Sequence, residues 1–310
     1  MSQAIQILTT VLPVVLTIAI GMLCRRTKLL SREGVAALKA VAVNITLPAV
    51  MLNAFASLNY TGKNVLLTLT MFAVCLAAWL LGRALQGVVR LPGRFTPFLT
   101  TGFEAGMLGY ALFMLLYGAE RVGDFACVDL GQVLFVFTLY KVLLGLNGGE
   151  KVTAGRLLDE MRRSPTVIAI VAGVLLGATG LYRAMAPSGL QGVLNACTDF
   201  VSAPTSCVIL IAIGYDLVPR EIPWRDVGRT LALRVAVMAA LRVVTGLALA
   251  AMGIEGLGPA LNIMFILPAP YVLPVFADDE RERASVSSTL SAMTLLTVIA
   301  FVVLAAVARG

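Results

Sequence analysis

One acidic residue lies inside an apolar, glycine-rich stretch and could do chemistry there. Glu104 belongs to the run from Gly102 to Gly109, within an apolar segment long enough to span a membrane. A charged carboxylate costs roughly 2.5 kcal/mol or more at that depth, and protonation removes most of this cost. A group that alternates between charged and neutral forms can couple proton movement to a change of state. We predict that Glu104 carries a proton. The alternative is a static carboxyl that accepts hydrogen bonds from backbone N–H groups freed by the break.

A second apolar stretch is interrupted by prolines. It runs from Leu261 to Asp278 and contains Pro268, Pro270 and Pro274, where an unbroken helix would need N–H donors. Lipid offers no water to the freed carbonyl groups, so a broken backbone is tolerated only inside the protein or along a cavity. Half-helix N-termini expose N–H groups that favour an anion. The stretch therefore predicts a transport site, and a kinked structural helix is the alternative.

Four further polar side chains within apolar segments are candidates to bind a ligand. Asn44, four residues before Pro48, offers donors and acceptors either to a substrate or to a loosened backbone. Asp199 is either a second titratable group or a residue near the external interface. Asn262 and Tyr271 flank the proline-broken run and are predicted to orient an anion.

For the other charged residues within the apolar segments we consider positions at the membrane surface or in structural pairs. Long basic side chains near helix ends reach the membrane surface, so we expect Lys141 and Arg234 to do this. Asp129 is expected to be solvated near an external end. Arg242 lies nearer the middle of its segment, where structural pairing competes with binding of an anionic substrate.

The composition is that of an integral membrane protein. Of the 310 residues, 59% are hydrophobic and 13% are charged, with mean hydropathy +0.92, which is more apolar surface than a soluble core could hide. Histidine is absent, so proton chemistry must fall to carboxylates and the commonest metal ligand is missing. The five cysteines form no C-x-x-C pair, which predicts small buried side chains without a metal or disulfide. Without H-E-x-x-H, G-x-S-x-G or phosphate-binding motifs, an enzyme is not expected.

Ten apolar segments of spanning length are predicted, which would put both termini on one side of the membrane. They cover residues 4–23, 35–57, 64–82, 95–118, 125–146, 165–182, 188–214, 227–252, 257–277 and 284–307. The alternate loops that include Arg25, Arg94 and Arg163 hold sixteen lysines and arginines, against four in the other loops and termini. Positive loops face the cytoplasm, so both termini are predicted outside a plasma membrane. The net charge of +7 therefore reports orientation and does not indicate nucleic-acid binding.

The segments divide into two halves around a polar connection. Residues 1–146 and 165–310 hold five segments each, and the predicted cytoplasmic linker is 147–164. The second half thus starts from the opposite face, as an inverted repeat requires. Pro48 and the glycine-rich run interrupt the second and fourth segments. Pro204 and the proline-broken stretch interrupt the seventh and ninth, in matching positions, which points to a binding site at the membrane midplane.

At these residues the chain resembles the auxin efflux carrier family, which includes the plant PIN-FORMED transporters and bacterial organic-anion carriers. The resemblance is carried by Asn44 to Pro48, Gly102 to Gly109 and Leu267 to Pro270. It implies the fold of bile acid sodium symporters: an all-α membrane protein with two inverted five-helix repeats, a scaffold domain, a core domain and broken helices crossing at the substrate site. Elevator-like alternating access without ATP and a homodimer are also implied. Gly106, Gly109, Pro48, Pro268 and Pro270 are then expected beside the substrate.

Two departures from the family pattern affect the coupling chemistry. Family members commonly place an asparagine where this chain has Glu104, and a crossover proline where it has Tyr110 and Ala111. We therefore predict a secondary transporter of a small organic anion, a carboxylate or an auxin-like acid, with protons favoured over sodium and no cofactor. A sodium-coupled symporter of the same fold and a membrane sensor that binds the ligand without moving it are the alternatives. A channel is less favoured, because the chain has no repeated pore motif.

Overall fold

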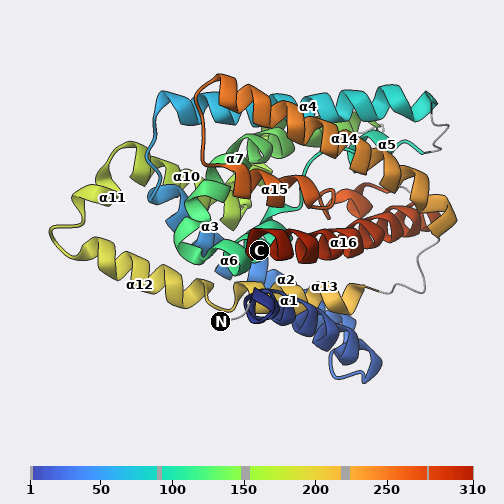
Figure 1. Cartoon of the computed structure of the whole chain (residues 1–310), viewed down its shortest axis with the longest axis horizontal. Helices are drawn as coiled ribbons and strands as arrows, with labels where there is room; N and C mark the ends of the chain where they lie inside the picture. The colour runs from blue at the N-terminus through green and yellow to red at the C-terminus, as the bar shows by residue number, and fades with distance from the viewer. Residues whose placement is uncertain (1–2, 89–92, 148–153, 218–223, 278, 310) are drawn as a thin grey trace.

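The chain folds into helices joined by turns. A computed structural model describes residues 3–88, 93–147, 154–217, 224–277 and 279–309, and it contains no strand in these ranges (Figure 1). Six described helical segments are long and apolar enough to cross a membrane: Arg32–Ala56, Gly62–Gly87, Ala119–Leu146, Leu190–Asp216, Val227–Ala251 and Glu280–Ala308. Two apolar segments are shorter, Ala105–Tyr117 and Pro165–Ala178. The prediction of an all-α membrane protein is confirmed at this level. Ten crossings and two inverted repeats stay predictions.

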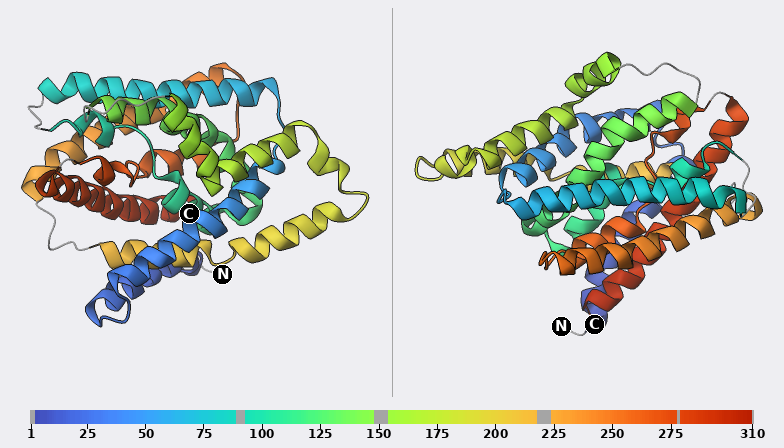
Figure 2. Two further views of the ribbon diagram at one scale, coloured as in Figure 1. Left: turned by 180° about the vertical axis from the view of Figure 1, so that it is seen from behind. Right: turned by 90° about the horizontal axis from the view of Figure 1, so that it is seen from above.

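One group of helices, here called the outer group, comprises α1, α2, α3, α10, α11, α12 and α13. Their bounds are α1 Gln3–Arg26, α2 Arg32–Val41, α3 Leu47–Ala56, α10 Pro165–Ala178, α11 Leu181–Ala184, α12 Leu190–Ser202 and α13 Thr205–Asp216, with a π-helical turn η1 at Ala42–Thr46. Helix α1 packs along α13, and α10 packs along α3. Figure 2 shows α11 and α12 extending away from the rest of the molecule.

A second set of helices, here called the inner group, contains both broken segments. Its elements are α4 Gly62–Val88, α5 Thr96–Leu99, η2 Ala105–Gly109, α6 Tyr110–Tyr117, η3 Ala119–Arg121, α7 Val122–Phe135, η4 Val136–Tyr140, α8 Lys141–Asn147, α14 Trp224–Ala251, α15 Gly258–Ile266, η6 Leu273–Phe276 and α16 Glu280–Arg309. Helix α4 packs against α5, α7 and α14, while α15 packs against α7, α14 and α16. The interior of this group holds most of the large buried aromatic side chains.

Local sequence explains where several helices begin and end. Ser31 and Ser164 accept hydrogen bonds from the backbone N–H groups of Gly34 (3.1 Å) and Val167 (3.4 Å), so each serves as the N-cap of the helix that follows it. Pro204 separates α12 from α13 within the predicted seventh segment. The predicted linker 147–164 contains a helix of its own, α9 (Ala154–Arg163), while residues 148–153 lie outside the described residues.

Glycines allow the closest approach between helices of the outer group. A Cβ atom on Gly21 of α1 would lie 2.1 Å from the carbonyl oxygen of Ile211, and one on Gly214 of α13 would lie 2.1 Å from that of Ile18. Helices in a membrane associate by close packing, which small residues at the contact permit. The α1 and α13 pair therefore depends on glycine at both positions.

Replacing Gly214 with isoleucine should separate α1 from α13, because the new side chain would overlap the α1 backbone. We expect little or no monodisperse protein in detergent and a lower melting temperature for any that is recovered. Gly192→Ile is the matched control, because Gly192 is also helical but has no atom within 4 Å of the added Cβ position. Size-exclusion profiles and thermal unfolding test this, and equal behaviour of the two variants would contradict the packing.

The cysteine prediction is partly wrong. Cys24 and Cys75 are buried and all five thiols are free, but Cys197 and Cys207 are exposed. Cys197 lies on α12 and Cys207 on α13, on faces that no other described helix covers. In a membrane such faces meet lipid. An apolar sequence therefore does not distinguish a core position from a lipid-facing one.

Candidate functional site

Both predicted breaks are present in the structure. The first follows α5, where residues 100–104 leave the helical path before η2 begins at Ala105, and Gly102 has φ +69°. The second follows α15, where Leu267 is extended with ψ 152° and a short 3₁₀ turn resumes at Leu273. Glycine adopts positive φ at no steric cost, and proline removes the N–H that continuation of a helix would need.

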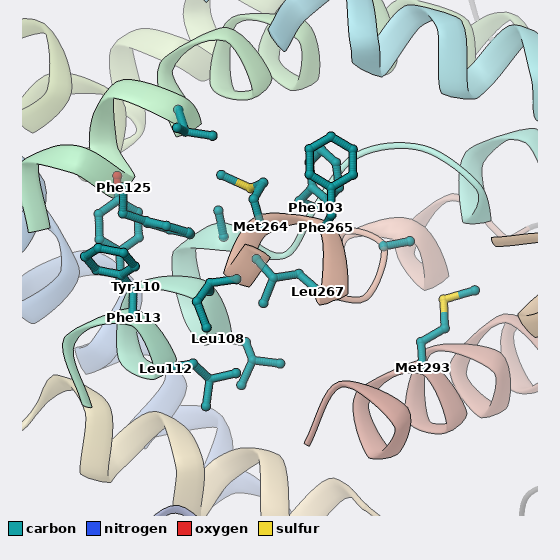
Figure 3. Packing of buried hydrophobic residues seen from close by; sticks show 14 of the residues in the cluster. Phe103, Leu108, Tyr110, Leu112, Phe113, Phe125, Met264, Phe265, Leu267 and Met293 are labelled. Atoms are coloured by element: carbon teal, nitrogen blue, oxygen red, sulfur yellow. The ribbon is translucent and has the colours of Figure 1, made fainter. Parts of the chain in front are cut away.

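The two breaks meet each other directly. The backbone N–H of Glu104 donates to the carbonyl oxygen of Pro268 at 2.9 Å. A Cβ on Gly102 would lie 2.9 Å from Cγ of Pro270, so the chains cross at close range. Phe103 and Phe265 pack edge to face with ring centroids 5.3 Å apart, beside the crossing (Figure 3). Predicted site residues from two distant parts of the chain thus share one location.

The Glu104 carboxyl joins the amino ends of the segments that resume after the breaks. One oxygen accepts from the N–H of Met107 at 3.2 Å, and the other accepts from the N–H of Tyr271 at 2.7 Å. These are N–H groups that a broken helix leaves without an intrahelical partner. These are the hydrogen bonds expected of a static carboxyl that accepts from freed backbone N–H groups. They also place the carboxyl at the centre of the crossing. Proton transfer by Glu104 stays a prediction.

The guanidinium of Arg234 joins the carboxyl ends of the segments that precede the breaks. It donates to the carbonyl oxygens of Leu99 (2.8 Å), Gly102 (2.9 Å) and Leu267 (2.8 Å). The side chain comes from α14 and the residue is only 4% exposed. The expectation that Arg234 extends to the membrane surface is therefore wrong. Helix α14 begins at Trp224, so Arg234 lies well inside it and cannot reach the end of the helix.

Other side chains of the inner group donate to three further carbonyl groups around the breaks. Tyr140 donates to the carbonyl oxygen of Phe98 at 3.2 Å, Gln132 donates to that of Phe103 at 2.9 Å, and Thr297 donates to that of Ile266. With the three bonds of Arg234 and the one from the Glu104 N–H, seven carbonyl groups around the breaks have donors from the protein itself. This is the condition for non-helical backbone at membrane depth.

A cavity of about 620 Å³ lies beside the crossing, between the inner and the outer group. Tyr271 and Met107 form its wall at the crossing, and the Tyr271 hydroxyl hydrogen-bonds to Thr294 of α16 at 2.7 Å. The opposite wall comes from α1, α2 and α13. Its charged lining residues are Arg25, Arg32, Lys39 and Asp216, of which Lys39 and Asp216 form an ion pair. The lining therefore has a net positive charge.

Several predicted site residues lie at the crossing. Pro268, Pro270 and Tyr271 belong to the second break and make the contacts described above. Gly109 packs against Leu267, where an added Cβ would lie 2.7 Å from a methyl carbon. Gly106 faces Leu47, at 3.3 Å from the added Cβ position, and so connects the break to the start of α3 next to Pro48.

Three predicted residues are not brought to the crossing. Asn44 is exposed and donates to the carbonyl oxygen of Ala40 at 2.9 Å, which fits the loosened-backbone interpretation. The Asn262 side-chain oxygen accepts two hydrogen bonds from Arg242, at 2.9 and 2.7 Å, so it does not face the cavity. Arg242 thereby has a structural partner rather than a carboxylate.

Asp199 lies at a different cavity, of about 510 Å³, which includes residues from the start of α7 and the end of α3. There it accepts from the Asn53 side chain at 3.4 Å and is exposed. Tyr182 completes a polar cluster by donating to Asn195 at 2.8 Å. The predicted external loops surround this cavity, which agrees with the interface interpretation of Asp199.

A second buried carboxyl was not anticipated. Asp129 is 1% exposed and accepts from the Tyr110 hydroxyl at 3.1 Å and the Gln132 amide at 3.3 Å. The expectation that Asp129 is solvated is therefore wrong. Asp129 and Gln132 are three residues apart and share one face of α7, and this polar pair on an apolar helix was the signal that could have shown the burial. Lys141 is partly buried, with its ammonium 5.0 Å from the centroid of the Phe137 ring.

Comparison of the sequence with models of known protein families found no match, and comparison with curated proteins found none.

Proposed function

We propose that the protein is a secondary transporter of a small organic anion, either a carboxylate or an auxin-like acid. The observation that carries the proposal is the crossing of two broken segments at the wall of a cavity with net positive lining. Broken helices in matching halves of a chain are typical of midplane binding sites in secondary transporters. The resemblance to auxin efflux carriers supports the same class.

The cavity has the size and chemistry for such a ligand. Small-molecule pockets commonly enclose roughly 300 to 1,000 Å³ and combine apolar walls with a few polar groups. Here about 620 Å³ is bounded by apolar residues of α2, α13 and α16, with hydroxyl groups from Ser287, Ser291 and Thr294. Arg25, Arg32 and Lys39 outnumber Asp216, which raises the local concentration of anions.

The charge distribution supports a cytoplasmic position for this cavity. Arg25 and Arg32 belong to the first of the positively charged loops, and both line the cavity. The second cavity, with Asp199, is lined by residues of the predicted external loops. The conformation would then be open to the cytoplasm, in a plasma-membrane protein with both termini outside. In Figure 2 the N-terminal end of α1 and the C-terminal end of α16 lie near each other, which is compatible with both termini on one side of the membrane.

The packing is compatible with elevator movement. The inner group would serve as the core domain and the outer group as the scaffold. Arg234 of α14, Gln132 of α7 and Thr297 of α16 all donate to the broken segments, so the crossing would move with these helices as one body. In the outer group, α1 pairs with α13 and α10 pairs with α3, which is the reciprocal pairing expected from two inverted repeats.

Uptake into proteoliposomes tests the proposal. A panel of small carboxylates and indole acids would be offered with an imposed proton gradient or an imposed sodium gradient. We expect at least one acid to accumulate when protons, but not sodium, supply the gradient. Specific binding without accumulation under either gradient would instead favour the membrane-sensor alternative.

Arg32 offers a direct test of the charged cavity. Arg32→Gln removes one positive charge from the lining, so the KM for the transported anion should rise about threefold to tenfold, corresponding to about 0.7–1.4 kcal/mol. Arg121→Gln is the control, because Arg121 pairs with Asp124 away from this cavity. Concentration-dependent uptake measures both variants, and an unchanged KM in Arg32→Gln would argue against anion entry through this cavity.

A further inference from the structure

The carbonyl groups at a helix break are ordinarily a place for a cation. Unwound backbone and half-helix carboxyl ends supply the oxygen ligands that hold sodium ions in transporters with broken helices. In this chain those oxygens already have a positively charged partner. The guanidinium of Arg234 donates to Leu99 at the end of α5, to Gly102 in the first break and to Leu267 in the second, with all three distances at 2.8 to 2.9 Å.

We propose that Arg234 is the resident cation of the crossing and that it makes the crossing independent of sodium. The inference rests on the proposed transport function only for its consequence, which is that sodium does not drive transport. Its structural content concerns the stability of the crossing and can be tested without a substrate.

The geometry of arginine suits this position. A guanidinium is planar, stays charged and carries five N–H donors in a fixed arrangement, so one side chain can satisfy carbonyl groups from two chain segments. Arg234 is buried, and its charge lies 6.0 Å from the centroid of the Phe103 ring at the crossing. A sodium ion at these carbonyl groups would have to displace the guanidinium, and the side chain would then lose all three hydrogen bonds inside an apolar interior.

Four further carbonyl oxygens around the breaks also have donors from the protein. The carbonyl groups of Phe98, Phe103 and Ile266 accept from side chains of α7, η4 and α16, and that of Pro268 accepts from the N–H of Glu104. Together with the three acceptors of Arg234, seven carbonyl oxygens around the breaks therefore have donors of the protein itself. These residues do not fit a bound sodium ion.

Thermal unfolding of the purified full-length protein tests the proposal. The melting temperature would be measured in sodium chloride, in potassium chloride and in choline chloride at equal ionic strength. The unmodified protein should melt at the same temperature in all three salts. Arg234→Met keeps an unbranched side chain but removes the guanidinium with its charge and donors, so this variant should melt lower in potassium and recover stability as sodium is added, with saturation.

Arg242→Met is the matched control. Arg242 also lies within α14, but it donates to the Asn262 side chain and not to the broken backbone. This variant should show no difference between sodium and potassium. Arg234→Lys keeps a positive charge with fewer donors, so it should be less stable than the unmodified protein and should not respond to sodium.

Three results would overturn the proposal: stabilisation of the unmodified protein by sodium but not potassium, a folded Arg234→Met without a sodium response, or failure to recover Arg234→Met even in sodium. None of these outcomes depends on transport. If no tested acid is taken up, the proposed transport function is wrong. The melting-temperature test of Arg234 is unaffected by that result, because it uses no substrate. Sodium-driven uptake would support transport but contradict the sodium independence proposed here.

Discussion

Glu104→Gln is expected to abolish proton-driven accumulation of the substrate while exchange of internal for external substrate continues. The carboxyl lies at the crossing of the breaks, where its two oxygens accept hydrogen bonds from the N–H groups of Met107 and Tyr271. A carboxamide cannot take up or release a proton. The accumulation ratio in proteoliposomes with an acidic exterior should fall at least tenfold, toward equal concentrations on the two sides.

The same substitution should also destabilise the fold. A carboxamide has a single oxygen, so one of the two N–H groups would face an NH₂ group, and loss of a hydrogen bond to a charged acceptor costs about 1.5–3 kcal/mol. Glu104→Asp is the informative control. It keeps an acid but is one methylene shorter, so it should retain part of the proton dependence while weakening the hydrogen bonds. Undiminished proton-dependent uptake in Glu104→Gln would leave Glu104 as a static acceptor, and Asp129 would become the carboxyl to replace next.

Gly102→Ala is expected to have the second large effect, namely loss of transport with a marked fall in stability. Gly102 has φ +69°, and its added Cβ would lie 2.9 and 3.1 Å from two ring carbons of Pro270. A left-handed backbone costs an ordinary residue roughly 1–2 kcal/mol, before any clash is counted. The rigid proline ring cannot rotate away. The crossing must therefore open, and the hydrogen bond from the Glu104 N–H to Pro268 would be lost.

Gly106→Ala is the control within the same glycine-rich run. Its φ does not lie in the left-handed region, and its added Cβ would meet the end of the Leu47 side chain at 3.3 Å and a carboxyl oxygen of Glu104 at an ordinary contact distance of 4.0 Å. That side chain can shift by a few tenths of an ångström. Melting temperature and uptake in Gly106→Ala should stay close to those of the unmodified protein, and an effect equal to that of Gly102→Ala would show that the run is sensitive to any added volume.

The positions of the breaks could be predicted because they are local properties of the sequence. Prolines 268 and 270 lack N–H groups, and glycine at position 102 permits a backbone that other residues avoid. Apolar segments long enough to span a membrane and the alternation of basic loops can likewise be recognised in the sequence alone. These features were sufficient to predict a helical membrane protein with two interrupted segments, and they placed Glu104 next to a break.

The partners of the broken backbone could not be predicted in the same way. Arg234 reaches Leu99 across 135 positions in the sequence, and Glu104 reaches Tyr271 across 167. Nothing near Arg234 in the sequence distinguishes it from an arginine that extends to the membrane surface. Burial of Asp129 likewise depends on which face of α7 turns toward α6. Both sequence expectations failed because a single segment does not reveal which of its sides another helix will cover.

The amino-acid sequence by itself determined that the chain is helical, that it is suited to a membrane and that its helices break near Gly102 and Pro268, since these follow from hydropathy and from the backbone chemistry of glycine and proline. Only the tertiary structure decided that the breaks cross, that Arg234 and Glu104 satisfy opposite ends of them, and that a positively lined cavity adjoins them. The physical reason is that these hydrogen bonds and this cavity form between residues of different helices, which come together only when the chain has packed.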